Sequence, residues 1–217
     1  MERRALSWLQ RLTSVRAVVD DARWVVLDVE ASGLDAAHDS LLAIAAIGVH
    51  IAAGHACIVL ADSFEVVLRQ PQAPPDRANI LLHGIGVGRQ RAGVEPLAAL
   101  GEFMRFAGRS PLVAFHAAFD RTLIERHLAS TGLPVPANPW LDLAPLAAVL
   151  YPEVRAQALD DWMGHFGIRC AQRHQAAADT MATAELLLRL WPRLREQAPP
   201  GVAAARKLAS QRRWLGS

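Results

Sequence analysis

Three stretches near the start of the chain combine apolar and β-branched residues, and turn-forming residues separate them. Residues 23–30 (RWVVLDVE) form a compact apolar run, and residues 41–51 and 56–68 form two longer ones. The AAGHA segment between the two longer runs has the composition of a hairpin turn. The pattern therefore predicts three successive strands, of which the second and third are antiparallel.

Helical spacing of apolar residues dominates the rest of the chain, interrupted by short strand-like segments. A Pro-rich loop separates the two parts. After it the pattern predicts helices at 93–108, 119–132, within 139–150, at 159–167 and at 178–191, the last closed by Pro192, and strands at 111–117 and at the start of 139–150. An antiparallel start followed by strand–helix alternation predicts an α/β fold in which helices flank a mixed β-sheet.

Composition indicates one ordered globular domain with terminal extensions. The chain has 217 residues, of which 52% are hydrophobic and 20% charged. We expect an N-terminal helical extension at 1–21, the main domain at 22–195 and a basic C-terminal tail at 196–217. Much of the basicity lies in these end segments. Either a polyanion contact or a solvated helix end explains it.

Several classes of protein are disfavoured by the same pattern. The apolar runs are too short to span a bilayer, which needs about 20 residues, and the N-terminus lacks the features of a secretory signal. The two cysteines, Cys57 and Cys170, form no CxxC pair, so the sequence suggests neither a disulfide framework nor a structural zinc site. We expect a cytoplasmic protein without a membrane partner.

Five residues with potential catalytic chemistry stand at element ends. Asp28 and Glu30 point to the same face of the first strand, although an isolated pair of this kind is commonplace on a surface. Asp120 follows the fourth strand, where a helix N-cap is the simpler explanation. His174 and Asp179 are five residues apart, about 140° on a helical wheel, so a shared site requires His174 on the loop or first turn.

These residue types favour one kind of chemistry. Carboxylate oxygens without nearby cysteine suit Mg²⁺ or Mn²⁺ better than zinc. Carboxylates sharing one cavity repel each other by about 4 kcal/mol per pair at 4 Å and a dielectric of about 20, so divalent cations are needed to neutralise them. Two such ions can stabilise the attacking and leaving oxygens of a displacement at phosphorus, and a histidine can accept the proton of the attacking water.

The order of three motifs carries a family resemblance. DxE at the first strand, HxxFD after the fourth strand and HxAxxD at the last helix resemble the exonuclease motifs of the DEDDh 3′–5′ exonucleases, the DnaQ-like proofreaders related to the epsilon subunit of bacterial DNA polymerase III. The resemblance covers residues 22–192. It implies a ribonuclease H-like fold with a five-stranded mixed sheet.

The resemblance also implies roles. Asp28, Glu30 and Asp179 would hold one metal ion, with Asp28 also touching a second. Asp120 would support the second ion and His174 would be the general base. The cofactors implied are two divalent ions, Mg²⁺ or Mn²⁺. The LLHGIG segment resembles the family's HGI element, and the implied substrate-binding positions are Ala31, Ser32, Gly33, Leu34, His83 and Phe119, although a structural histidine and an inward-packed phenylalanine are the alternatives.

The chain departs from the family pattern in two respects. Ala31 and Ser32 stand where two threonines are common, and Ala117 stands where an asparagine is common. These differences concern substrate contacts. The five positions implied in metal binding and proton transfer are intact. Asp142, Asp160 and Asp161 are interpreted as helix-start residues outside the site.

The sequence thus predicts an enzyme that removes nucleotides from the 3′ end of DNA, preferably single-stranded, and releases nucleoside 5′-monophosphates, in proofreading or repair. One alternative is an accessory subunit that docks on a DNA polymerase through its basic tail or N-terminal helix. Another is an RNA-trimming relative of ribonuclease T or oligoribonuclease. The HGI resemblance favours the polymerase-associated branch.

Overall fold

A single mixed sheet organises the protein in this computed structural model, which describes residues 18–70 and 77–212. The strand order is β3-β2-β1-β4-β5, with β1 antiparallel to β2, β2 antiparallel to β3, and β1, β4 and β5 mutually parallel. The strands span Arg23–Ala31 (β1), Leu41–Ala52 (β2), His55–Val67 (β3), Leu112–Ala114 (β4) and Trp140–Asp142 (β5). The prediction of a five-stranded mixed sheet flanked by helices is confirmed. The helix predicted within residues 1–21 lies outside the described residues.

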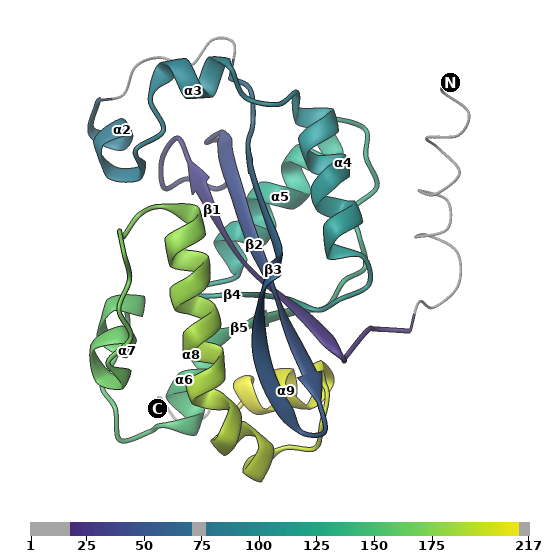
Figure 1. Ribbon diagram of the computed structural model, residues 1–217, viewed down its shortest axis with the longest axis vertical. Helices are drawn as coiled ribbons and strands as arrows, with labels where there is room; N and C mark the ends of the chain where they lie inside the picture. Colours follow the sequence, from purple (N-terminus) through teal and green to yellow (C-terminus); the bar gives the residue numbers. More distant parts are fainter. Residues whose placement is uncertain (1–17, 71–76, 213–217) are drawn as a thin grey trace.

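Helices cover both faces of this sheet, so the structure has three layers (Figure 1). The helices span Arg77–His83 (α2), Val87–Arg91 (α3), Pro96–Ala107 (α4), Ala118–Ser130 (α5), Leu143–Leu150 (α6), Leu159–Phe166 (α7), Ala176–Gln197 (α8) and Val202–Ala209 (α9). One core cluster joins the sheet to α6, α7, α8 and α9, and another joins it to α4 and α5. Helices α2 and α3 lie beyond the carboxyl end of β1 (Figure 1).

The alternation of side chains along β1 explains how one strand serves both layers. Trp24 and Val26 are buried in the α8-side cluster, whereas Val25 and Leu27 are buried in the α5-side cluster. Successive side chains of a strand point to opposite faces. Asp28 therefore continues the α8-facing row, at the position where the next apolar residue would otherwise lie.

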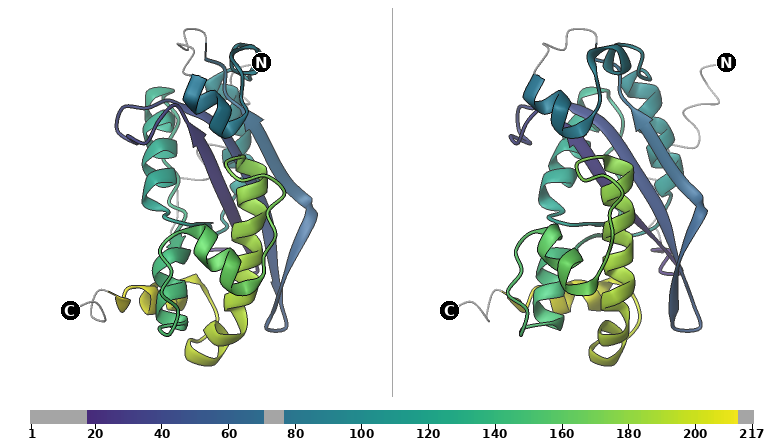
Figure 2. Two further views of the ribbon diagram at one scale, coloured as in Figure 1. Left: turned by 90° about the vertical axis from the view of Figure 1, so that its left-hand side faces the viewer. Right: turned by 60° about the vertical axis from the view of Figure 1, so that its left-hand side comes forward.

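The β2–β3 hairpin is the longest arm of the sheet (Figure 2). Its two-residue turn has positive φ at Ala53 (49°) and Gly54 (82°), as the turns of tight hairpins require. The Trp191 indole Nε1 of α8 donates a hydrogen bond of 2.9 Å to the Gly54 carbonyl oxygen. The tip of the hairpin is thus fixed to the C-terminal half of α8.

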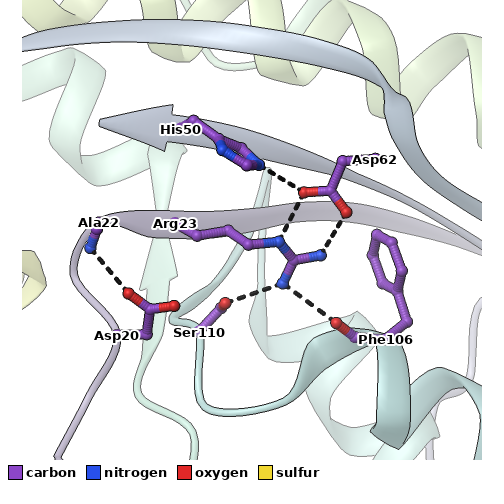
Figure 3. A network of polar contacts seen from close by, with 7 residues as sticks. All are labelled: Asp20, Ala22, Arg23, His50, Asp62, Phe106 and Ser110. Carbon is purple, nitrogen blue, oxygen red and sulfur yellow. Dashed lines mark hydrogen bonds and ion pairs between the residues drawn. The ribbon is translucent and has the colours of Figure 1, made fainter. Parts of the chain in front are cut away.

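A polar network fixes the amino end of β1 (Figure 3). The Arg23 guanidinium donates to both Asp62 carboxylate oxygens, at 2.6 and 2.8 Å, and to the Ser110 hydroxyl at 2.9 Å. His50 Nε2 lies 2.7 Å from Asp62 Oδ2. These bonds lower the pKa of Asp62 to about 2, the Arg23 hydrogen bond contributing most.

The same network explains an irregularity between β2 and β3. The register shifts between Ile47 and Gly48, and the extra residues of β3 include Asp62. A Cβ at position 48 would lie 1.9 Å from Asp62 Oδ2, so only glycine fits opposite the inward-turned carboxylate.

The predicted elements differ from the structure in the C-terminal part. Helix α8 does not close at Pro192, because the proline lies inside the helix and buried Trp191 and Leu194 pack on either side of it. Residues 196–217 do not form a separate tail along their whole length, because Val202, Ala205 and Leu208 of α9 are buried in the core. Helix α9 packs against α6 and β5.

Candidate active site

Asp28 and Glu30 lie at the carboxyl end of β1 and face α8. Both side chains are partly buried. A register shift between Glu30 and Ala31 ends the regular pairing of β1 with β2 directly after the two acids. The central strand thus places two carboxylates on the same face of the sheet, as the two-residue spacing predicts.

Asp120 reaches the same strand end from the opposite layer. Strand β4 is only three residues long and pairs with Val25 and Val26 alone, which leaves the later part of β1 without a partner on that side. The Asp120 carboxyl is 4% exposed and accepts a hydrogen bond from the backbone N–H of Val29. Asp120 stands in the first turn of α5 rather than at its N-cap, which is Ala117.

Asp179 enters from α8, and His174 lies on the loop before that helix. Asp179 is 6% exposed and lies in the first turn of α8, which begins at Ala176. His174 is exposed, has φ of 61°, and its backbone N–H donates 3.0 Å to Asp179 Oδ2. The requirement that His174 precede the helix is therefore met. The Cys170 thiol lies 3.6 Å from Asp179 Oδ1.

Arg173 also contacts Asp179. Its Nη1 forms an ion pair with Asp179 Oδ1, and its Nε lies 2.6 Å from Asp160 Oδ1. Asp160 is in the first turn of α7, and its side chain is 59% exposed. No sequence pattern points to Arg173 as part of the site, because one arginine in a polar loop cannot be distinguished from solvated arginines by its neighbours.

The carboxylates influence one another electrostatically. Burial raises the pKa of Asp28 well above its ordinary value, and the charges of Asp120, Asp179 and Glu30 raise it further. Burial, followed by the charge of Asp179, raises the pKa of Glu30 to about 8. Burial also raises the pKa of Asp120 to about 7. The four acids, which come from β1, α5 and α8, therefore form one electrostatic unit.

Hard carboxylate oxygens that repel one another fit a divalent cation. In the parts of the chain that the structure describes, however, no group of three or more His, Cys, Asp or Glu side chains is arranged closely enough to hold an ion as it stands. The four carboxylates are donors that suit a divalent cation. One of them, Asp179, is paired with the Arg173 guanidinium.

The loop after the two acids is held by α5. The Ser32 hydroxyl donates 2.8 Å to Asp39 Oδ1, and a Cβ at Gly33 would lie 2.5 Å from the same carboxylate. Arg126 donates to the backbone oxygens of Ala36 and Asp39. Leu34 is 94% exposed. These contacts with Asp39 and Arg126 hold the turn that contains Ser32, Gly33 and Leu34, and the apolar side chain of Leu34 lies in solvent.

His83 lies beside Glu30 and is 2% exposed. Its Nδ1 accepts a 2.9 Å hydrogen bond from the Ile85 N–H. Both His83 and Glu30 line a pocket of about 50 Å³. Asn79 of α2 donates 2.9 Å to the Ala31 carbonyl oxygen, so the segment before His83 is tied to the end of β1.

The remaining candidates occupy the positions expected of structural residues. Phe119 packs against the α5-side core. Asp142 is the N-cap of α6, with Oδ1 accepting 3.0 Å from the Ala144 N–H. Asp161 accepts from the backbone N–H groups that precede α7. The interpretation of these two acids as helix-start residues agrees with the contacts.

Comparison with known proteins identifies the class. The family model RNase_T, described as Exonuclease, matches residues 25–187. The chain belongs to this exonuclease family, and the prediction of a DnaQ-like hydrolase of the 3′–5′ exonuclease class is confirmed at the level of the domain. Divalent metal ions are cofactors of the family.

The curated relatives are much longer proteins. DNA polymerase III PolC-type of Clostridium perfringens is 31% identical over 179 residues, covering 82% of this chain and 12% of that protein. The corresponding protein of Bacillus subtilis is 30% identical over 186 residues, covering 85% and 12%. The chain therefore spans about an eighth of these relatives.

Solved structures of exonuclease I share the fold. One covers 82% of this chain and 44% of its own, with a TM-score of 0.68 and 17% identity. The E. coli enzyme in complex with a dT13 oligonucleotide covers 81% and 43%, with a TM-score of 0.67 and 17% identity. The ribonuclease H-like fold is thereby confirmed. None of the described helices combines the length and apolarity needed to cross a membrane.

Proposed function

We propose that the chain hydrolyses phosphodiester bonds at the 3′ end of DNA, preferably single-stranded, and releases nucleoside 5′-monophosphates with two bound Mg²⁺ or Mn²⁺ ions. The observation that carries the proposal is the convergence of Asp28, Asp120 and Asp179 from three elements, where burial and then mutual repulsion raise the pKa of Asp28. The bound ions would supply neutralisation of these acids and stabilisation of the charge that develops at phosphorus.

The chain's own residues divide the remaining work. Asp28, Glu30, Asp120 and Asp179 would hold the ions. His174, exposed beside Asp179, would accept the proton of the attacking water, because histidine side chains exchange protons near neutral pH. The hydrogen bond from its backbone N–H to Asp179 links the position of this loop to the carboxylate.

Two further side chains would contact the terminal nucleotide. His83 shares the small pocket beside Glu30, and Leu34 projects into solvent from the turn that follows β1. Ala31, Ser32 and Gly33 would line the path of the substrate strand at the same strand end, and Phe119 supports the first turn of α5 from the core. The complex of exonuclease I with dT13 supports single-stranded DNA as the substrate to test first.

The test uses matched DNA and RNA oligonucleotides labelled at the 5′ end. We expect a ladder of progressively shorter labelled DNA products with Mg²⁺ or Mn²⁺, and loss of the ladder in the folded variants Asp28→Ala and His174→Ala. An intact, folded wild-type chain that is inactive on DNA and RNA with both metals would contradict the proposal. Faster digestion of RNA would instead assign the chain to the RNA-trimming alternative.

A polymerase-associated role is a second candidate, favoured by the similarity to PolC-type polymerases. Deletion of the whole segment after residue 197 would remove buried side chains of α9, so it does not test docking alone. Reversal of the exposed charges Arg206 and Lys207 to glutamate leaves the buried face intact. Loss of co-purifying polymerase in this double variant would support docking through α9. If no polymerase co-purifies with the wild type, the polymerase-associated role is excluded.

A further inference from the structure

One positively charged side chain lies inside the acidic cluster. The three nitrogens of the Arg173 guanidinium are divided between two acids: Nη1 faces Asp179, whereas Nε and Nη2 lie 2.6 and 3.4 Å from the two Asp160 oxygens. The side chains of Arg173 and Asp179 are 26% and 9% exposed. The guanidinium therefore bridges a nearly buried acid and the exposed acid of another helix.

The charge of Arg173 acts beyond these two contacts. It lowers the pKa of Asp28 and of Glu30, opposing the neighbouring carboxylates that raise both. Arg173 thus supplies part of the positive charge that the cluster needs. A divalent cation at Asp179 would supply the same charge to the same acids, so the two cations compete for one carboxylate.

The division of contacts gives the guanidinium an alternative position. Loss of the Asp179 contact affects Nη1 alone and leaves Nε and Nη2 on Asp160. Oxygen Oδ2 of Asp179 remains held by the His174 N–H, so Oδ1, which among the described residues would keep only the contact with the Cys170 thiol at 3.6 Å, is the atom that the exchange makes available. Arg173 stands in the loop between α7 and α8, and Asp160 in the first turn of α7, so the exchange needs no movement of α8.

We propose that Arg173 is an internal counter-ion that pairs with Asp179 in the metal-free protein and transfers entirely to Asp160 when a divalent ion binds. The proposal rests on the metal site of the proposed function. It assigns Asp160 a role outside the ligand set, as the residue that retains the displaced guanidinium. Metal affinity is then set partly by the balance between the two pairings of Arg173.

Isothermal titration of Mn²⁺ into the folded, metal-free chain tests this without measuring activity. In Arg173→Gln the ion has no competitor, and we expect binding about tenfold tighter than in the wild type. In Asp160→Asn the guanidinium has only Asp179 as its partner, and we expect weaker binding, by about threefold. Arg169→Gln removes the same charge from an exposed site on the same loop and should leave the affinity within about twofold.

The double variant separates exchange from a general electrostatic effect. If Asp160 acts only through Arg173, Asp160→Asn has no effect on Mn²⁺ affinity in the Arg173→Gln background. If both residues act merely as charges near the site, their effects on the binding free energy add. Additive effects, or unchanged Mn²⁺ affinity in Arg173→Gln, would overturn the proposal.

Melting in the absence of metal provides a second measurement, and it also shows whether the variant folds. Arg173→Gln should melt at a lower temperature than the wild type without metal, and Mn²⁺ should raise its melting temperature by a larger interval. Arg173→Lys keeps the charge but cannot bridge both acids, and its affinity should lie between those of wild type and Arg173→Gln. Absence of Mn²⁺ binding in every folded variant would contradict the metal site itself, and thereby the proposed function.

Discussion

Acids lie beside the two ends of β1 in opposite electrostatic situations. At the amino end, Arg23 and His50 surround one carboxylate, and the pKa of Asp62 falls to about 2. At the carboxyl end, several acids are buried near each other, and the pKa of Glu30 rises to about 8. One strand thus joins a saturated structural network to an acid cluster that lacks sufficient positive charge. The difference teaches that partners, and not burial alone, decide whether an acid stabilises the fold or is available for chemistry.

The largest effect should come from Asp28→Asn, which keeps the shape of the side chain but removes its charge from the centre of the cluster. We expect kcat/KM on single-stranded DNA to fall at least about 10³-fold, because an acid implied in holding both ions is lost. The metal-free protein should be no less stable, since repulsion is relieved. Retention of activity, measured with protein of confirmed fold, would contradict the assignment of the cluster.

Substitution of Asp62 of β3, which pairs with Arg23 at the amino end of β1, should have the reverse outcome. Asp62→Ala leaves Arg23 without its carboxylate, and we expect a loss of about 2 kcal/mol of unfolding free energy, with activity retained at 25 °C. Because the pKa of Asp62 is lowered in the folded state, its contribution is complete above about pH 4 and disappears as the pH falls towards 2. Urea unfolding of wild type and variant at pH 7 and pH 3 measures both effects; an equal difference at the two pH values would contradict the network's role.

Glu30→Gln should stabilise the metal-free protein, in contrast to Asp62→Ala. The pKa of Glu30 is raised in the folded state, so its contribution to stability is complete below about pH 4 and is lost as the pH rises through about 8. At pH 9 in EDTA we expect the variant to exceed the wild type by about 1 kcal/mol, after allowance for solvent screening. Thermal melting at pH 5 and pH 9 checks the sign, and an advantage for the wild type at pH 9 would contradict it.

The smallest predicted effect concerns the segment that follows the acids. His127 Nε2 accepts a 3.1 Å hydrogen bond from the Leu41 N–H, and its Nδ1 lies 2.8 Å from the Leu123 carbonyl oxygen, so the ring is neutral. Burial lowers the pKa of His127, and the stability that depends on the neutral ring is lost as the pH falls below about 6.5. We expect the wild type to lose about 0.5 kcal/mol more than His127→Gln between pH 8 and pH 5, after allowance for solvent screening of the half-exposed ring. Parallel denaturation curves for the two proteins would contradict this.

Much of the site was predictable because its acids stand at element ends in a pattern that backbone geometry constrains. The two-residue spacing of Asp28 and Glu30 fixes their common face, and the five-residue spacing of His174 and Asp179 requires His174 to lie on the loop or first turn if the two share a site. Their spatial convergence with Asp120 could be argued only through the family resemblance, since it depends on the short strand β4.

Other features depend on tertiary contacts and carry no local pattern. Pro192 is a reasonable helix end in sequence, but buried residues on both sides of it continue the helix. The basic residues of α9 are typical of a solvated tail, although the opposite face of the helix packs in the core. The position of Arg173 between Asp160 and Asp179 depends on how α7 and α8 are oriented, which residue types alone do not determine.

The hydrogen bond from the Thr180 hydroxyl to the Ala45 carbonyl oxygen, 3.1 Å long, joins residues 135 positions apart. Thr180 directly follows Asp179, so this hydrogen bond fixes α8 to β2 next to that acid. During synthesis from the N-terminus, the β2–β3 hairpin can pair early, because its strands are adjacent in the chain, whereas α8 is added near the end. The four acids can therefore come together only after α8 has been synthesised, so shorter nascent chains would lack the complete acid cluster.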